Sequence, residues 1–245
     1  MKTIAIAGGT GWVGRRVVES VRRLGAEPIV IARSKGIDLT TGTGLDQALE
    51  GVDDVIDVTN IVTQNRRRAT AFFETSTRHL LDAEKRHGVK HHVLLSIVGI
   101  DRVGLGYYQA KLAQEDLVRQ GPVPWTILRA TQFHEFAAQM LGGGPVAVVP
   151  SMLSQPVAAQ DVANELVRLA TAPPVGMAAE LAGPREERVP DMARRLASAR
   201  GHQPLVITLP LPGATGRVMR TGALLPTNTG PRGTQTFDQW LQEST

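Results

Sequence analysis

Short apolar runs alternate with amphipathic stretches along most of the chain. Runs of strand length lie at residues 4–7, 27–32, 52–58, 93–98 and 124–129, and each precedes a stretch whose apolar positions have helical spacing. Strands that alternate with helices in this way predict βαβ units, and hence a parallel sheet with helices on both faces. The pattern therefore indicates an α/β fold with a doubly wound parallel sheet.

The rest of the chain predicts a few more elements and then changes in composition. The expected elements are a strand at 146–149, a helix at 156–172, the last strand of the sheet at 180–182, a helix at 192–199, an extended segment at 205–209 and a C-terminal helix docked by Phe237, Trp240 and Leu241. From Pro184 on, Arg, Pro, Gly and Thr dominate. A chain of 245 residues is long enough for one α/β domain and too short for two. We expect one domain, residues 1–245, in which residues 184–245 form a small lobe that caps the substrate side.

The first apolar run leads into a glycine-dense turn, GGTGWVG, and then into a helix. Two spacings overlap there, GxxGxxG from Gly8 and GxGxxG from Gly9. Such glycines allow a positive φ in the turn, a close approach of the backbone to a pyrophosphate, and tight packing of helix on strand. The free N–H groups of the first helical turn then hold the anion. The predicted contacts of a dinucleotide phosphate are Gly8, Thr10, Gly11, Trp12, Val13 and Gly14.

Basic residues follow the second strand. Sites specific for NAD place an acidic side chain about 20 residues beyond the glycines, on the ribose 2′-hydroxyl, but Arg33 stands there. A guanidinium offers a 2′-phosphate paired donors and an opposite charge, and Arg15 and Lys35 could join it. We predict NADP(H) in preference to NAD(H). The alternative is a group of solvated basic residues near a turn.

Residues at the carboxyl ends of parallel strands face the ligand crevice. Asp38 and Leu39 are therefore candidates for the adenine edge, and Thr59 and Asn60 for the adenosine ribose. Asp38 could equally cap a turn.

A second group of chemically active residues follows the fourth strand. Ser96 lies near the end of that strand, and a helix opens with Tyr107, Tyr108 and Lys111. Because Tyr107 and Lys111 are four positions apart, they share one helical face. An ammonium beside a phenol lowers the phenol's pKa, so Tyr107 could exchange a proton with a substrate carbonyl while Lys111 holds the nicotinamide ribose and Ser96 orients the carbonyl oxygen. Tyr108 competes for the role of proton donor, and ordinary packing is the alternative for both tyrosines.

The fifth strand leads into ATQFHEF, which is expected at the substrate end of the crevice. Phe133 and His134, with Tyr108, are the candidate substrate contacts; His134 could be an alternative acid, or a helix-capping or solvated histidine. We interpret His91 and His92 as a solvated turn before the strand. Neighbours on a strand point to opposite faces, so joint metal ligation by this pair is not expected, and we predict no metal.

Composition excludes several classes of chemistry. The chain has no cysteine, which rules out disulfides, thiolate metal sites and cysteine nucleophiles. A net charge of +4 with scattered basic residues and only 4% aromatic residues does not favour nucleic-acid binding. Arg66, Arg67 and Arg68 form the one basic run, which we interpret as solvated; the alternative is that they rim the mouth of the site and attract an acidic ligand. The chain begins with its first strand and has no apolar run of membrane-spanning length, so we expect a soluble cytoplasmic protein, a monomer or homodimer, with a small-molecule substrate.

Several separated segments together resemble one family. They are GGTGWVGR, IARSK, GVDDVIDVTN, LLSIVGID, YYQAKLAQEDLV, PWTILRATQFHEF, PVAAQDVANELV and ELAGP, in that order. The chain resembles the atypical short-chain dehydrogenases/reductases of the NmrA-like group, well over about the first 185 residues and loosely beyond. The resemblance implies a Rossmann fold with NAD(P)H across the carboxyl ends of the strands. It also implies phosphate binding by Gly8, Gly11 and Gly14, 2′-phosphate binding by Arg33, and a nicotinamide-side Lys111.

Two functions fit this resemblance. The first is an NADPH-dependent oxidoreductase that transfers hydride to a carbonyl, quinone or related electrophile, with Tyr107 as proton donor and Lys111 as its partner. The second is a non-catalytic sensor that binds NAD(P)(H) and regulates a partner protein. The combination of Ser96, Tyr107 and Lys111 favours the reductase, because a sensor needs no proton donor.

Overall fold

The computed structural model describes residues 1–63, 65–201 and 204–244. The chain divides into two compact units, which are described separately. Unit 1 comprises Met1–Ser96, Gly106–Arg129 and Val162–Ala178, and unit 2 comprises Ile97–Leu105, Ala130–Asp161 and Ala179–Thr245.

Unit 1 is built on a six-stranded sheet with strand order β2-β1-β3-β4-β5-β8. The strands are β1 Thr3–Ala7, β2 Glu27–Ile31, β3 Asp54–Asp57, β4 His91–Ile97, β5 Trp125–Ala130 and β8 Gly176–Met177. The helices are α1 Trp12–Arg23, a 3-10 turn η1 Arg33–Lys35, α2 Leu45–Leu49, α3 Arg66–His87, α4 Gly106–Gln120 and α6 Ala159–Ala170. β1 pairs in parallel with β2 on one side and β3 on the other, which confirms the doubly wound parallel sheet.

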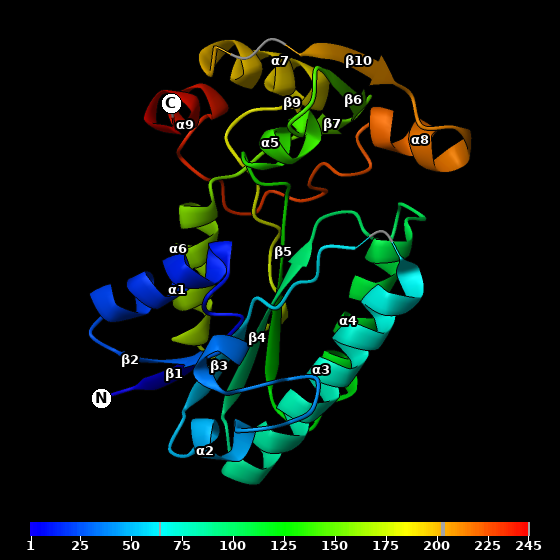
Figure 1. Cartoon of the computed structure of the whole chain (residues 1–245). Helices are drawn as coiled ribbons and strands as arrows, with labels where there is room; N and C mark the ends of the chain where they lie inside the picture. Colours follow the sequence, from blue (N-terminus) through cyan, green and yellow to red (C-terminus); the bar gives the residue numbers. More distant parts are fainter. Residues whose placement is uncertain (64, 202–203, 245) are drawn as a thin grey trace. The chain divides into compact units, whose positions relative to one another are not determined.

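Helices cover both faces of this sheet (Figure 1), with α3 beside α4 on one face and α1 beside α6 on the other. On the α3–α4 face, Leu81, Leu94, Val118 and Ile127 form one buried cluster. Four successive apolar residues of β1, residues 4–7, are fully buried, so both faces of this strand are covered, as expected for a sheet with helices on both sides. After β1 the chain forms β2 on one side of β1, and it then crosses to the other side of β1 to form β3. The strand order therefore reverses between β1 and β3. In open α/β sheets ligands bind at the carboxyl ends of strands at such a reversal.

Unit 2 contains small sheets and short helices. Its elements are α5 Phe136–Leu141, β6 Val146–Pro150, β7 Leu153–Ser154, β9 Glu187–Arg188, α7 Val189–Ala199, β10 Leu205–Leu209, α8 Gly213–Arg220 and α9 Phe237–Ser244. β6 pairs in parallel with β10, and β7 pairs antiparallel with β9. The expected lobe of residues 184–245 lies in this unit, which also includes residues 97–105 and 130–161. That this unit caps the substrate side stays a prediction.

Two sequence interpretations are wrong. His91 and His92 do not form a solvated turn: they open β4 and are 2% and 0% exposed. Each is buried because it has a polar partner on its own face of the sheet, Thr126 for His91 and Glu84 for His92, each with a contact of 2.8 Å. The expected last strand at 180–182 forms only isolated bridges, and β8 occupies the edge of the sheet instead.

Candidate functional site

The turn after β1 requires glycine for two different reasons. Gly8 has a φ of +81°, which a residue with a side chain rarely adopts. A Cβ on Gly14 would lie 2.2 Å from the carbonyl oxygen of Gly8. The Gly11 N–H donates to this same oxygen at 2.9 Å. The loop is therefore a tight backbone cradle that no larger residue at position 14 could form.

This cradle leads directly into the amino terminus of α1. The N-cap residue is Gly11, which provides no side-chain cap, and the first turn contains no acidic residue. The first N–H groups of a helix have no partner within the helix, and the helix dipole makes them attractive to an anion. Thr10 is exposed and Trp12 is 55% exposed, with the Arg16 guanidinium 3.9 Å from the centroid of its ring. The open cradle and uncapped helix fit a dinucleotide phosphate.

Arg33 lies in the 3-10 turn after β2, and its side chain is exposed. Asp38 accepts hydrogen bonds from the Thr40 N–H at 2.8 Å and the Thr40 hydroxyl at 2.7 Å, so its carboxylate caps a turn. These bonds, together with the charge of Arg33, hold the pKa of Asp38 below its usual value. The Leu39 side chain is buried, and its carbonyl oxygen lies 2.8 Å from His79 Nδ1. Contacts of Asp38 and Leu39 with adenine stay predictions.

The carboxyl end of β3 brings Thr59 and Asn60 close to the cradle. The ideal Cβ on Gly8 would lie 3.2 Å from Thr59 Cα, and the Thr59 N–H donates to Asp57 Oδ1 at 2.8 Å. The exposed Asn60 accepts a hydrogen bond of 2.6 Å from the Tyr107 hydroxyl through its Oδ1. The structure thus brings Tyr107 to the carboxyl end of β3, which pairs with β1, the strand that leads into the cradle.

Tyr107 lies in an aromatic environment on α4. Its ring centroid is 5.8 Å from that of Phe73 on α3, in an edge-to-face arrangement. Burial raises the pKa of the Tyr107 phenol, and the neighbouring Tyr108 adds to this effect. Tyr108 is 8% exposed, with its ring centroid 6.2 Å from that of Tyr107.

Lys111 is more deeply buried than the sequence suggests. It is 4% exposed, and its Nζ donates to the Leu95 carbonyl oxygen at 2.9 Å and to Gln114 Oε1 at 2.6 Å. Burial lowers its pKa to about 8, although Asp57 and Glu115 act in the opposite direction. The ammonium and the Tyr107 phenol therefore bond to different partners, and the pKa of the phenol is raised.

Sequence reasoning missed the residues that hold Lys111. Gln114 bridges it to a buried carboxylate, because Gln114 Nε2 donates to Asp57 Oδ2 at 3.0 Å. Two signals were available: Gln114 is three residues after Lys111 and so on the same helical face, and Asp57 is a charged residue that directly follows two apolar residues, Val55 and Ile56, in a predicted strand.

Ser96 lies near the carboxyl end of β4 and is 2% exposed. Its Oγ has no hydrogen-bond partner within the part of the chain that the structure describes. A buried hydroxyl without a partner is uncommon, and it leaves this group available to a ligand oxygen.

Of the two candidate substrate residues in unit 2, His134 packs against the C-terminal helix. His134 is not solvated: it is 0% exposed, and its ring centroid lies 5.8 Å from that of Phe237 and 5.9 Å from that of Trp240. Its Nε2 lies 3.1 Å from the Gln235 carbonyl oxygen, and burial lowers its pKa to about 4. Phe133 forms an isolated bridge with Val157. Substrate contacts of Phe133, His134 and Tyr108 stay predictions.

Neither a metal cluster nor a membrane span is found in residues 1–63, 65–201 and 204–244. No group of three or more His, Asp or Glu side chains is arranged there to hold a metal ion. None of the helices in these ranges is both long and apolar enough to cross a bilayer.

The sheet of unit 1, its strand reversal and the glycine cradle define a dinucleotide-binding α/β protein. A family model described as NAD(P)H-binding matches residues 8–173, and the chain belongs to this family. The resemblance to short-chain dehydrogenases/reductases is thereby confirmed, and the predicted class, an oxidoreductase, is that of the three similar proteins described next.

Three similar proteins illustrate the range of the relatives. A ceramide reductase of Caulobacter vibrioides is 25% identical over 251 residues, which cover 91% of this chain and 77% of that protein. The NADPH-dependent quinone oxidoreductase of Escherichia coli, solved with NADPH, has a TM-score of 0.73 and 21% identity, with 98% and 99% of the two chains covered. The triphenylmethane reductase of Citrobacter sp., solved with NADP(H), has a TM-score of 0.74 and 16% identity, with 99% and 100% covered. At these identities the solved structures establish the shared fold.

Proposed function

We propose that this protein is an NADPH-dependent oxidoreductase that reduces a carbonyl, a quinone or a related small-molecule electrophile. The observation that carries the proposal is the cradle of Gly8, Gly11 and Gly14 before an uncapped helix, with Ser96 and Tyr107 near the carboxyl ends of strands in the same sheet. The similar proteins support the class, since all three are reductases or oxidoreductases. Their substrates differ, so they support no single substrate for this chain.

The cofactor would be held by backbone groups and one guanidinium. The N–H groups of the cradle and of the first turn of α1, from Gly8 to Gly14, are suited to the pyrophosphate. Thr59 and Asn60 are suited to the adenosine ribose, and Asp38 and Leu39 to the adenine edge. Arg33 is exposed and would pair with a 2′-phosphate, which favours NADPH over NADH.

The protein would supply position, charge and a proton. When bound, the nicotinamide supplies the hydride. A phenol whose pKa is raised by burial stays protonated near neutral pH, so Tyr107 would act as a proton donor in the direction of reduction. Its hydroxyl would exchange the bond to Asn60 for one to the substrate oxygen. The Ser96 Oγ, which lacks a partner among the described residues, would orient that oxygen.

Lys111 would contribute a buried positive charge on the same helix as Tyr107. Gln114 and the Leu95 carbonyl fix the ammonium in place. A fixed charge near the reacting atoms stabilises negative charge that develops on the substrate oxygen, because no solvent needs to reorganise.

A non-catalytic NAD(P)(H) sensor is the second candidate. The observation in its favour is that both polar groups of the proposed mechanism already have partners within the protein: the Tyr107 hydroxyl bonds to Asn60, and the Lys111 ammonium bonds to Leu95 and Gln114. A binding protein without turnover would need neither group to be free.

Measuring NADPH consumption in the presence of a panel of quinones, aldehydes and ketones distinguishes the reductase from the sensor. We expect turnover, and we expect Tyr107→Phe to lower kcat by roughly 100-fold or more, the usual contribution of a positioned acid. Tyr108→Phe is the matched control and should retain activity. Full activity of Tyr107→Phe would remove this residue from the mechanism. Tight NADPH binding without turnover of any substrate would favour the sensor.

A further inference from the structure

The small sheet of β6 and β10 in unit 2 presents an unusual outward surface. The strands run in parallel, and their register places Leu205 beside Val146 and Ile207 beside Val148. The next pair is Leu209 with Pro150, so apolar side chains form adjacent rows. The large members of these rows are strongly exposed, at 48% for Val146, 55% for Val148, 64% for Leu205, 38% for Ile207 and 49% for Leu209. We call these five residues the apolar face.

The opposite face of the same sheet is buried. Ala147 is 3% exposed and Val149 is 0% exposed, and β6 contacts both α5 and α7. Side chains that alternate along β6 therefore point either into the core of unit 2 or to the surface. A two-stranded sheet is marginally stable by itself, and here helices support it on one face alone.

Exposed apolar side chains are concentrated on this surface. Among the described residues of unit 2, every strongly exposed large apolar side chain belongs to the apolar face or to Leu211, which continues the row of β10. In unit 1 they are distributed over distant segments, such as Trp12, Leu24 and Val62. Scattered exposed apolar residues are normal, whereas a contiguous patch on the order of 500 Å² marks an interaction surface.

The composition of the apolar face indicates what covers it. It contains no charged residue, so it has no electrostatic pattern that would require a complementary partner. An uncharged apolar patch can pack against a second copy of itself without charge repulsion, and a twofold contact joins the same surface of both copies. Two such patches would remove roughly 1,000 Å² from water, about the minimum for a specific interface. Stacked sheets lie about 10 Å apart, and each copy would supply the layer that the other lacks.

We propose that the apolar face is the contact surface of a homodimer of this chain, formed when the β6–β10 sheets of two copies stack face to face. This contact lies wholly within unit 2, and it does not depend on the proposed reductase activity.

Sedimentation velocity of the full chain tests the proposal. We expect a dimer at concentrations of tens of micromolar, and we expect Val148→Lys to raise the dissociation constant at least 10-fold, because the contact would bury an unpaired charge. Ile207→Lys should have the same effect. Val148→Thr, which keeps the shape and adds no charge, should weaken the dimer less.

Val175→Lys is the matched control, because Val175 is a valine of similar exposure, 59%, in unit 1. It should leave the dissociation constant unchanged. Circular dichroism of each variant shows whether it is folded. A monomeric wild-type protein at these concentrations would overturn the proposal, as would a dimer that Val148→Lys and Val175→Lys affect equally. A monomer that co-sediments with phosphatidylcholine vesicles, and loses this binding in Val148→Lys, would overturn it in favour of a lipid surface.

Discussion

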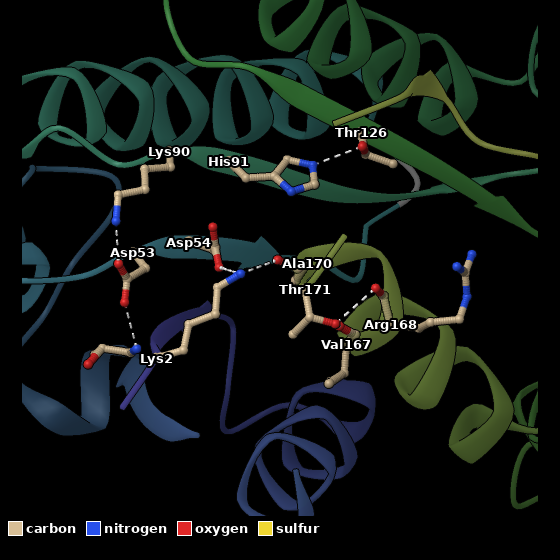
Figure 2. A network of polar contacts seen from close by, with 11 residues as sticks. Lys2, Asp53, Asp54, Lys90, His91, Thr126, Val167, Arg168, Ala170 and Thr171 are labelled. Carbon is tan, nitrogen blue, oxygen red and sulfur yellow. Dashed lines mark hydrogen bonds and ion pairs between the residues drawn. The ribbon is translucent and has the colours of Figure 1, made fainter. Parts of the chain in front are cut away.

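The two ends of the sheet in unit 1 both carry polar groups but use them differently. At the amino ends of the strands, charged and polar side chains bond to one another or to the backbone (Figure 2). The Lys2 Nζ lies 2.6 Å from Asp54 Oδ2 and donates to the Ala170 carbonyl oxygen at 2.9 Å. The Lys90 Nζ donates to Asp53 Oδ1 at 2.7 Å. This end holds β1, β3 and α6 together.

At the carboxyl ends of the same strands, polar groups are left open. The helix that follows β1 has no side-chain cap, Arg33 is exposed, and the Ser96 Oγ has no partner within the described ranges. An unsatisfied buried hydroxyl such as that of Ser96 reduces stability unless a ligand supplies its partner. The comparison supports the proposal that the carboxyl end binds a ligand, whereas the amino end stabilises the fold.

The largest expected effect is at the carboxyl end. Gly14→Ala places a Cβ 2.2 Å from the Gly8 carbonyl oxygen, so the cradle must open. We expect NADPH affinity to fall by roughly 100-fold or more, measured by isothermal titration calorimetry. Gly143→Ala is the control, because a Cβ there would meet no atom within 4 Å. Unchanged affinity in Gly14→Ala would show that the cradle is not the phosphate site.

The second prediction concerns pH and the amino end. Burial lowers the pKa of His91 to about 4 from its ordinary value of 6.5, so the folded state holds this imidazole neutral. The resulting stability is complete above pH 6.5 and is lost as the pH falls from 6.5 towards 4. The loss should reach about 3 kcal/mol at most.

Urea unfolding at a series of pH values measures this loss. His91→Gln should flatten the fall in unfolding free energy relative to the wild type, and His134, whose pKa burial also lowers to about 4, should supply the part that remains. If His91→Gln and the wild type have the same pH profile of unfolding free energy, the loss of stability does not come from His91.

The third prediction concerns Asp54, a buried carboxylate, and the effect of removing its partner Lys2. Asp54 is 2% exposed, and burial raises its pKa while Lys2 partly offsets this effect. Lys2→Met leaves the carboxylate unpaired and should lower the unfolding free energy by about 2 kcal/mol, less than for a fully buried pair because the Lys2 side chain is partly exposed. NADPH affinity of the folded protein should not change. If Lys2→Met keeps its stability but binds NADPH more weakly, the amino end is not the stabilising end, and the contrast between the two ends of the sheet is contradicted.

The smallest effect is expected at the surface of the same network. The Lys90 side chain is 74% exposed, and water screens its ion pair with Asp53. Lys90→Met should leave the midpoint of urea unfolding unchanged. A clear loss of stability would show that the exposed pair contributes as much as the buried one.

The sequence was informative where residues that are neighbours in the chain determine a local structure. The apolar runs predicted the five principal strands of the sheet, and the GGTGWVG turn predicted the cradle, because strand, turn and helix are adjacent in the chain. The order of these segments also predicted the family.

The bonds that individual side chains form decided what the sequence patterns did not predict. His91 and His92 look like a polar turn until Thr126 and Glu84, which lie elsewhere in the chain, provide bonds that make their burial possible. In the same way, Lys111 has the spacing of a partner for Tyr107, but Gln114 and the backbone of β4 bind its ammonium. Helical spacing places side chains on one face and does not determine which bonds they form.

The central claim, that the carboxyl end of the sheet binds NADPH through the cradle and Arg33, is tested most directly by dissociation constants for NADPH and NADH. We expect NADPH to bind at least ~10-fold more tightly in the wild type, and Arg33→Ala to remove most of this preference by weakening NADPH alone. Arg22→Ala, at an exposed arginine of α1, should leave the ratio unchanged. An equal ratio in Arg33→Ala and the wild type, or no binding of either dinucleotide, would contradict the account.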